Sequence, residues 1–316
     1  MKSSFQLQHQ FQQSNTQYRG RFAPSPSGPL HFGSLVAALG SYLQAKSQNG
    51  LWFVRIEDID KPREVPGSVD TILDGLQRFG LFWDQDPNTT SEQQYRQCLV
   101  QSSRQERYQH IFDQLKKHNH LYTCHCTRKG IKKLGGIYLG QCRDKNHEFD
   151  QHAVRLKQHF EHGQFEDLLQ GHIEVDKHLV NEDYIIKRTG GLFAYQLVVV
   201  IDDIDQGITE VVRGADIMEL TPRQINLFNL FGVTPPSYLH LPLIVSEDGK
   251  KLSKQNHAPA LNCDDPIPEL IKALTCLGLP TENTTWLSSS SVTEIIEWAI
   301  KNWDIKHIPT QLDILI

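Results

Sequence analysis

The chain has 316 residues, of which 39% are apolar and 22% are charged, and its formal net charge is −5. This length suits roughly two domains, and the composition is typical of a soluble globular protein. The net charge excludes a protein whose whole surface attracts nucleic acid, although it leaves room for a local basic patch.

The chain begins with a polar segment that is rich in glutamine. It lacks the apolar centre of a secretory signal, so we expect a disordered tail over residues 1–18. No stretch of the sequence approaches the ~20 apolar residues of a membrane-spanning helix. We therefore expect a cytoplasmic protein that does not bind membranes.

The residues that follow alternate between short apolar strands and amphipathic helices. We expect a strand at 19–23, a helix at 34–45, a strand at 51–58, and helices at about 67–81 and 103–117. Apolar residues recur every three or four positions in the first helix, as Leu35, Leu39 and Tyr42 do. This alternation predicts an α/β domain with a parallel sheet.

Residues 121–178 break this rhythm and hold many histidines, lysines and glutamines, so we expect a subdomain inserted between two halves of the sheet. The α/β pattern resumes with "DYIIKR" at 183–188 and "FAYQLVVVIDDID" at 193–205, and it continues with a helix at 221–231 and a strand at 238–245. The expected division is therefore 1–18 (tail), 19–120 (first half), 121–178 (insertion), 179–245 (second half) and 246–316 (a loop and a helical C-terminal region).

Three of the six cysteines, Cys124, Cys126 and Cys142, fall close together in the insertion. In a cytosolic protein such a cluster indicates a metal rather than disulfides. Zinc takes four ligands in a tetrahedral shell, and the cysteines would supply three of them. By chemistry alone the fourth would be His125 or His147. Free thiols are the alternative interpretation.

A phosphate site is one interpretation of "SPSGPLHFGSL" at 25–35, where glycines, prolines and His31 precede a helix. A helix N-terminus offers unpaired N–H groups and a positive dipole end. The alternative is a plain turn between strand and helix. Neither the Walker lysine nor a GxGxxG signature is present.

A second segment, "SEDGKKLSKQNH" at 246–257, places Lys251 and Lys254 on either side of Leu252 and Ser253. By itself it would be a solvated basic loop.

Together the two segments resemble the signature motifs of class I aminoacyl-tRNA synthetases. "HFGS" at 31–34 is similar to the HIGH motif, and "KLSKQ" at 251–255 is similar to the KMSKS loop. The glutamyl/glutaminyl branch is indicated by "RFAPSPSG" at 21–28, "RIEDID" at 55–60, "YQLVVVIDD" at 195–203 and "VVRGAD" at 211–216. The resemblance covers about residues 19–260. It implies a Rossmann-like parallel sheet that is split by a zinc-bearing subdomain and followed by a short helical region.

Only about sixty residues follow Gln255, which leaves no room for the anticodon-binding domains of a full glutamyl enzyme. The chain resembles a compact subfamily that attaches glutamate to the queuosine base in the anticodon of tRNA(Asp). The implied function is a ligase that activates L-glutamate with ATP, without needing tRNA, and then transfers the glutamyl group to that base. The rivals are a truncated enzyme that charges a tRNA 3′ end and a non-catalytic paralogue that binds amino acid or tRNA. The missing domains argue against the first, and the set of His31, Lys254, Arg21 and Glu57 argues against the second.

The resemblance also implies roles for particular residues. His31 and Lys254 would be catalytic, because they would stabilise negative charge on the phosphates. ATP would contact His31, Gly33, Lys251, Ser253 and Lys254. Glutamate would contact Arg21, Phe22, Ala23, Pro24, Ser25, Glu57, Tyr195 and Arg213. Guanidinium groups suit the carboxylates of glutamate, and Glu57 would accept its ammonium. The alternatives are a helix-capping histidine, a surface lysine, surface ion pairs and a core tyrosine.

In the compact subfamily a tyrosine four residues before the last cysteine, here Tyr138, completes the zinc shell. The implied cofactors are one structural Zn²⁺, and Mg²⁺ bound with ATP. The basic stretch 128–133, "RKGIKK", suits contact with an RNA backbone, although a solvated face explains it equally well. We expect a monomer whose partners are L-glutamate, ATP and tRNA(Asp) carrying queuosine.

Overall fold

The computed structural model describes residues 17–86, 98–133, 135–149, 152–158, 163–246, 249 and 259–316. Apart from its last two residues, the expected tail lies outside these ranges. The candidate ATP ligands Lys251, Ser253 and Lys254 also lie outside them.

Strands and helices alternate along the first part of the chain. They are β1 (Arg19–Phe22), α1 (Phe32–Ser47), β2 (Leu51–Ile56), α2 (Ser68–Arg78), β3 (Leu99–Val100) and α3 (Gln105–Lys117). The middle part adds β4 (Leu121–Cys124), α4 (Arg128–Lys133), β5 (Ala153–Leu156), β6 (Gln164–Asp167), β7 (Gly171–Glu174), α5 (Lys177–Val180) and β8 (Ile185–Lys187). The last part holds α6 (Tyr195–Asp205), β9 (Glu210–Gly214), α7 (Thr221–Phe231), β10 (Ser237–Leu241), β11 (Leu243–Val245), α8 (Ile267–Cys276), α9 (Val292–Lys301) and β12 (Asp313–Leu315).

The centre of the molecule holds two sets of parallel strands that lie edge to edge and come from the two halves of the chain. Strands β1, β2 and β3 pair in parallel, and so do β9, β10 and β6. The two sets meet where the Thr209 N–H donates to the Arg19 carbonyl at 3.0 Å and the Arg19 N–H donates to Thr209 Oγ1 at 2.9 Å. The predicted α/β class with a parallel sheet is confirmed.

Helix α1 forms because its apolar residues gather on faces that the sheet and the C-terminal helices cover. Leu35, Leu39 and Leu43 are fully buried beside Trp52 of β2. The Trp52 indole N–H donates to Ser41 Oγ at 2.9 Å, which satisfies both polar groups inside this core. Burial of these side chains fixes α1 against β1 and β2, and it therefore fixes the turn that precedes the helix.

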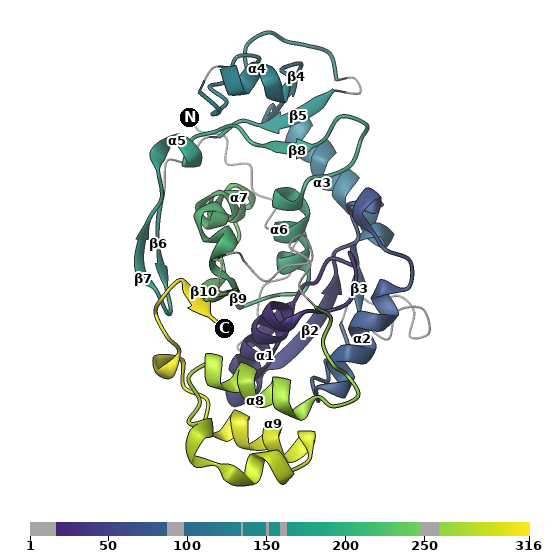
Figure 1. Ribbon diagram of the computed structural model, residues 1–316. Helices are drawn as coiled ribbons and strands as arrows, with labels where there is room; N and C mark the ends of the chain where they lie inside the picture. The colour runs from purple at the N-terminus through teal and green to yellow at the C-terminus, as the bar shows by residue number, and fades with distance from the viewer. Residues whose placement is uncertain are drawn as a thin grey trace.

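A small antiparallel sheet of β4, β5 and β8 lies at the top of the molecule in Figure 1, above α6 and α7. Because β8 at Ile185–Lys187 pairs with β5, this sheet continues past residue 178, where the sequence places the end of the insertion. "DYIIKR" therefore does not resume the parallel sheet. The hairpin β6–β7 lies within the expected insertion but joins the central sheet through β10.

The C-terminal region contains the expected helices, α8 and α9, which lie below α1 in Figure 1. Leu270, Leu274 and Ile295 from these helices belong to the same buried cluster as α1. The chain ends with β12, which pairs in parallel with β11 and was not foreseen from the sequence.

None of the helices in the described ranges combines the length and the apolar character that crossing a bilayer requires.

Candidate active site and metal site

The turn before α1 contains a glycine with an unusual backbone conformation and a histidine that caps the helix. Gly28 is buried and has φ +127°, a conformation that L-residues rarely adopt. His31 is the N-cap residue of α1: the Ser34 N–H donates to its Nδ1 at 3.2 Å, and its Nε2 lies 2.9 Å from Ser34 Oγ. The capping interpretation is therefore true of His31. It is compatible with a catalytic role, because the cap fixes the imidazole at the helix start.

The start of α1 also meets the chain that follows the predicted lysine loop. Ala260 forms an isolated bridge with His31, and the Leu261 N–H donates to the Leu30 carbonyl at 3.1 Å. The first intrahelical bond runs from the Leu35 N–H to the His31 carbonyl, so the N–H groups of Phe32 and Gly33 have no helical partner to reach. These donors can face an anion, and Gly33 adds no side chain there.

Glu57 lies directly after β2, at the carboxyl end of a parallel strand. Its side chain is 9% exposed and its Oε1 lies 3.6 Å from Arg55 Nε, too far for a hydrogen bond. Oε1 is buried and has no hydrogen-bond partner among the described residues. Burial raises the pKa of Glu57 to about 7, against the opposing effect of Arg55 and Arg21. An ammonium group of a ligand would satisfy this oxygen and its charge.

Arg21 and Arg55 share one buried carboxylate. Asp203 Oδ1 accepts from Arg21 Nε at 3.1 Å and from Arg55 Nη2 at 2.6 Å. Although burial acts to raise it, the two guanidinium groups hold the pKa of Asp203 below its usual value. One carboxylate beside two cations leaves local positive charge, which Glu57, with its raised pKa, and Asp202 partly offset.

Arg213 is a buried cation surrounded by neutral acceptors. It donates from Nη1 to Gln224 Oε1 at 2.8 Å, from Nη2 to Thr221 Oγ1 at 2.8 Å and from Nε to His240 Nε2 at 3.1 Å. His240 Nδ1 lies 2.7 Å from Asp167 Oδ2, so His240 donates to Asp167 and accepts from Arg213. Burial lowers the pKa of His240, which favours this neutral form. The chain Asp167–His240–Arg213 thus orients the guanidinium from β6 and β10.

Two tyrosines complete this centre. Burial raises the pKa of Tyr195, the first residue of α6, and the charges of Arg213, Glu57 and Arg21 act on the same hydroxyl. The Tyr238 hydroxyl is buried without a hydrogen-bond partner among the described residues, and the Arg213 guanidinium carbon lies 5.3 Å from the centre of its ring. Unpaired buried hydroxyls are costly, so Tyr238 is a further group that a ligand could satisfy.

The structure therefore places Arg21, Glu57 and Arg213 within electrostatic reach of the Tyr195 hydroxyl. Neither Arg21 nor Arg213 forms an ion pair at the surface, because both side chains are buried. The other predicted glutamate contacts, residues 22–25, lie at the end of β1 and in the segment that follows it. The rings of Phe22 and Trp52 are stacked, with their centres 6.4 Å apart. The Pro24 carbonyl accepts a hydrogen bond from the Glu57 N–H at 3.0 Å. Ser25 is exposed, and Ala23 lies between Phe22 and Pro24.

Sequence reasoning missed Asp203, Arg55, His240, Asp167 and Tyr238. Asp203 and Arg55 stood inside quoted motifs but were not singled out. Their roles depend on pairings across 148 to 182 residues of chain, such as Arg55 with Asp203 and Arg21 with Asp203. The one available signal was charge at positions where burial was expected, because buried charges need partners.

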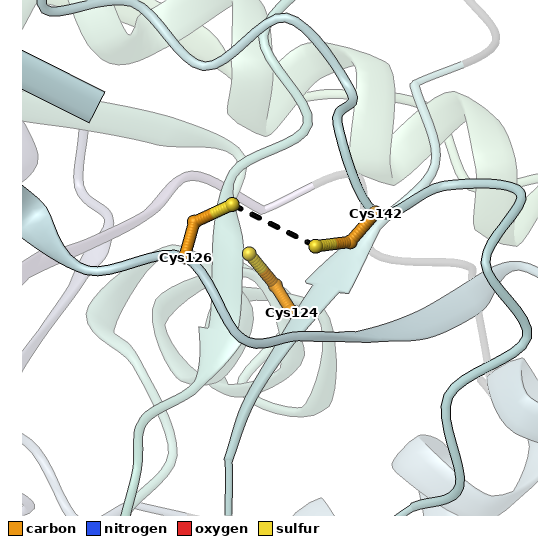
Figure 2. A group of neighbouring side chains, drawn as sticks. All are labelled: Cys124, Cys126 and Cys142. Carbon is orange, nitrogen blue, oxygen red and sulfur yellow. Dashed lines mark hydrogen bonds between the residues drawn. The ribbon is translucent and has the colours of Figure 1, made fainter. Parts of the chain in front are cut away.

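The predicted cysteine cluster is present: the Sγ atoms of Cys124, Cys126 and Cys142 lie within 4.8 Å of one another. Figure 2 shows the three sulfurs pointing toward a common centre, and Cys126 Sγ lies 3.6 Å from Cys142 Sγ. Zinc–sulfur bonds of about 2.3 Å in a tetrahedron place sulfurs about 3.8 Å apart. Although burial acts to raise it, a hydrogen bond from Arg155 helps to keep the pKa of Cys124 below its usual value. The three sulfurs could hold a metal ion.

Tyr138 lies beside this cluster. Its hydroxyl accepts from the Cys142 N–H at 2.9 Å, and its ring lies under the Arg155 guanidinium at 3.6 Å. Burial raises the pKa of this hydroxyl, and a hydrogen bond with Cys124 adds to the rise.

The alternative ligands have other neighbours. The ring of His125 is stacked between those of His147 and His152, with ring centres 4.0 Å and 3.9 Å away, respectively. Within the described ranges, no histidine nitrogen joins the cysteine group.

Comparisons with known proteins agree with this architecture. The family described as tRNA synthetases class I (E and Q), catalytic domain, matches residues 17–309. A glutamate tRNA ligase from Elizabethkingia meningosepticum, solved in complex with its amino acid, is 24% identical with a TM-score of 0.76. The match covers 93% of this chain and 66% of that one, and it shows a common fold.

Closer relatives match almost the whole chain. The glutamyl-Q tRNA(Asp) synthetase of Vibrio parahaemolyticus is 50% identical over 297 residues, which are 94% of this chain and 96% of that protein. The protein of the same name from Escherichia coli K12 is 52% identical over 296 residues, 94% of this chain and 92% of its own. The chain therefore belongs to the class I tRNA synthetase family (E and Q), within the branch formed by the glutamyl-Q tRNA(Asp) synthetases.

Proposed function

We propose that this chain activates L-glutamate with ATP in the absence of tRNA, and then transfers the glutamyl group to the queuosine base in the anticodon of tRNA(Asp). The names of the relatives support the acceptor. Their near-complete coverage favours this reaction over a truncated enzyme that charges a 3′ end, and the assembled site favours it over a non-catalytic paralogue.

One observation carries the glutamate assignment: Arg213 is a buried guanidinium whose hydrogen-bond partners are all neutral. Among the described residues no carboxylate forms a salt bridge with it. A buried charge is costly unless an opposite charge meets it, and a carboxylate matches the planar fork of arginine. Arg213 would therefore bind one carboxylate of glutamate, Arg21 would attract the other, and Glu57 would accept the ammonium.

Activation would proceed by attack of the α-carboxylate oxygen on the α-phosphorus of ATP, with pyrophosphate leaving. His31, fixed by its cap, and the N–H groups at Phe32 and Gly33 would donate to phosphate oxygens. Lys251, Ser253 and Lys254 would contact the leaving phosphates, and each donor of this kind contributes a few kcal/mol in the transition state. Mg²⁺ bound with ATP would neutralise phosphate charge.

The acceptor is tested by mapping where labelled glutamate lands. Transfer is expected to tRNA(Asp) that carries queuosine, and it should persist after enzymatic removal of the 3′-terminal adenosine. Single-stranded loops are where proteins can reach unstacked bases, which supports attack by a hydroxyl of the modified base. Transfer that is lost with the adenosine, or that is equal on tRNA lacking queuosine, would contradict this acceptor.

We also propose that the metal is one structural Zn²⁺, held by Cys124, Cys126, Cys142 and Tyr138. All four groups belong to one cluster in the insertion. A closed shell of four protein ligands leaves no position for a substrate and is typical of structural zinc.

Replacing Cys126 by serine is expected to remove the zinc and to loosen the sheet of β4, β5 and β8. The glutamate site draws its residues from other strands, so pyrophosphate exchange should keep most of its rate. Metal analysis and exchange assays measure the two effects, with Cys98→Ser as the control outside the cluster. Absence of zinc from freshly prepared parent protein would refute the site, and full retention of zinc by Tyr138→Phe would assign the fourth position to another ligand.

The chain would act as a monomer in the cytoplasm, where ATP, glutamate and tRNA occur together. The helix α4, which carries "RKGIKK", would lie near the RNA backbone, because lysine and arginine neutralise phosphates.

A further inference from the structure

A cavity of about 400 Å³ lies apart from the glutamate site, where α3 meets β5 and the turn after β8. Its lining includes Phe112 and Lys116 of α3, Phe149, and Lys187 and Arg188 at the end of β8. In Figure 1 these elements meet at the junction between the inserted sheet and the α/β core. A volume of this size lies within the range of small-ligand sites.

The wall of the cavity combines aromatic rings with cations. Phe149 is 38% exposed and meets Phe112 edge to face at 6.4 Å. Lys116 Nζ lies 4.2 Å from the centre of the Phe149 ring, and Lys187 Nζ lies 4.8 Å from that of Phe112. An exposed ring beside lysines is the combination that binds single-stranded nucleic acid, because the ring stacks on a base and the cation meets a phosphate.

The charge of the lining is positive although the chain carries −5 overall. Lys116, Lys187 and Arg188 face one acidic lining residue, Asp113. Arg188 is paired with Asp60 at 3.0 Å, and the two lysines remain in excess over Asp113. A local excess of cations in an acidic protein favours an anionic ligand at this place.

The cavity is joined to the glutamate site by short stretches of chain. Beyond Arg188 the chain turns back, and the Ala194 N–H donates to the Ile186 carbonyl at 2.8 Å just before Tyr195. Asp60, the partner of Arg188, follows Glu57 closely in the sequence. Arg188 therefore ties the edge of the cavity to the segment that carries Glu57.

We propose that this cavity binds one unpaired nucleotide of the acceptor RNA, a neighbour of the nucleotide that receives glutamate. Its base stacks on Phe149 and its phosphate meets Lys116. This inference rests on the proposed function, since it requires an RNA acceptor. It adds a subsite that holds the RNA without taking part in glutamate activation.

The test measures the Kd of queuosine-containing tRNA(Asp) for paired variants. Phe149→Ala should weaken binding about tenfold or more, as loss of one stacked base does, and Phe149→Tyr should restore it. Phe82→Ala, at another exposed phenylalanine (58% exposed) outside the cavity, is the control. Lys116→Ala should weaken binding and reduce the slope of log Kd against log salt by about 0.7, the value for one phosphate contact on a single strand. Lys117→Ala, on the same helix but outside the lining, should leave both unchanged.

Glutamate-dependent pyrophosphate exchange should be unchanged in all five variants. Unchanged Kd values for Phe149→Ala and Lys116→Ala, or equal losses in Phe82→Ala and Lys117→Ala, would overturn the subsite. Failure of the parent chain to transfer glutamate to tRNA would instead count against the proposed function, and the Kd values would still decide whether the cavity binds RNA.

Discussion

Replacing Arg213 by glutamine is expected to lower kcat/KM for glutamate in pyrophosphate exchange by roughly 30- to 5000-fold, because removal of one partner of a buried charge pair costs about 2–5 kcal/mol. The loss should fall on glutamate, and the KM for ATP should remain near that of the parent chain. Arg213→Lys keeps the charge but loses the fork that meets Gln224 and Thr221 and that would meet a carboxylate of glutamate, so it should be impaired to an intermediate degree.

A matched control separates binding from folding in this experiment. Arg223 is also buried, at 7% exposure, but donates to the Leu179 carbonyl and to Glu182. Arg223→Gln should lower Tm without a selective loss of glutamate affinity. An Arg213→Gln variant that folds and binds glutamate as the parent does would remove Arg213 from the site.

Replacing Glu57 by glutamine is expected to weaken glutamate binding by roughly 10- to 100-fold at pH 8, the effect of one lost hydrogen bond between charged groups. The parent should show a pH dependence that the variant lacks. Since burial raises the pKa of Glu57 to about 7, the carboxylate becomes protonated below pH 7 and can no longer accept an ammonium without losing its proton. The KM for glutamate should then rise by up to about tenfold per pH unit as the pH falls below 7.

The same substitution should have the opposite effect on stability. A carboxyl whose pKa is higher in the folded chain contributes stability below its unfolded pKa, and this contribution is lost as the pH rises through 7. Glu57→Gln should therefore raise the free energy of unfolding at pH 8 by at most roughly 3 kcal/mol, and by much less at pH 5. Urea unfolding at both pH values measures this difference. A destabilised variant at pH 8, or the same KM profile in parent and variant between pH 6 and 8.5, would contradict the assignment.

The sequence predicts the helices well wherever apolar residues recur with helical spacing. Helix α7 occupies residues 221–231, as expected, and α1 extends the expected helix by two residues at each end. The pairing of the small sheet is harder to predict, because a short segment such as Ile185–Lys187 carries no information about its partner strand. Its pairing with β5, and that of β12 with β11, follow from tertiary packing.

The residues of the candidate site were likewise predicted only in part. The resemblance of the motifs nominated Arg21, Glu57, Tyr195 and Arg213, and in the structure the other three act on the Tyr195 hydroxyl. The residues that set their charge and orientation could not be nominated in this way. Asp203 is shared by two arginines from different strands, and Asp167 reaches His240 from a hairpin that the sequence assigns to the insertion. Such partners become visible only when the chain is folded.

We propose that a buried guanidinium and a neighbouring carboxylate select glutamate for activation by ATP. Exchange of labelled pyrophosphate into ATP, measured without any RNA, tests it most directly. We expect exchange that depends on L-glutamate, and at least about a hundredfold weaker exchange with L-glutamine, which lacks the second carboxylate. Absence of exchange with glutamate, or equal exchange with glutamine, would contradict it.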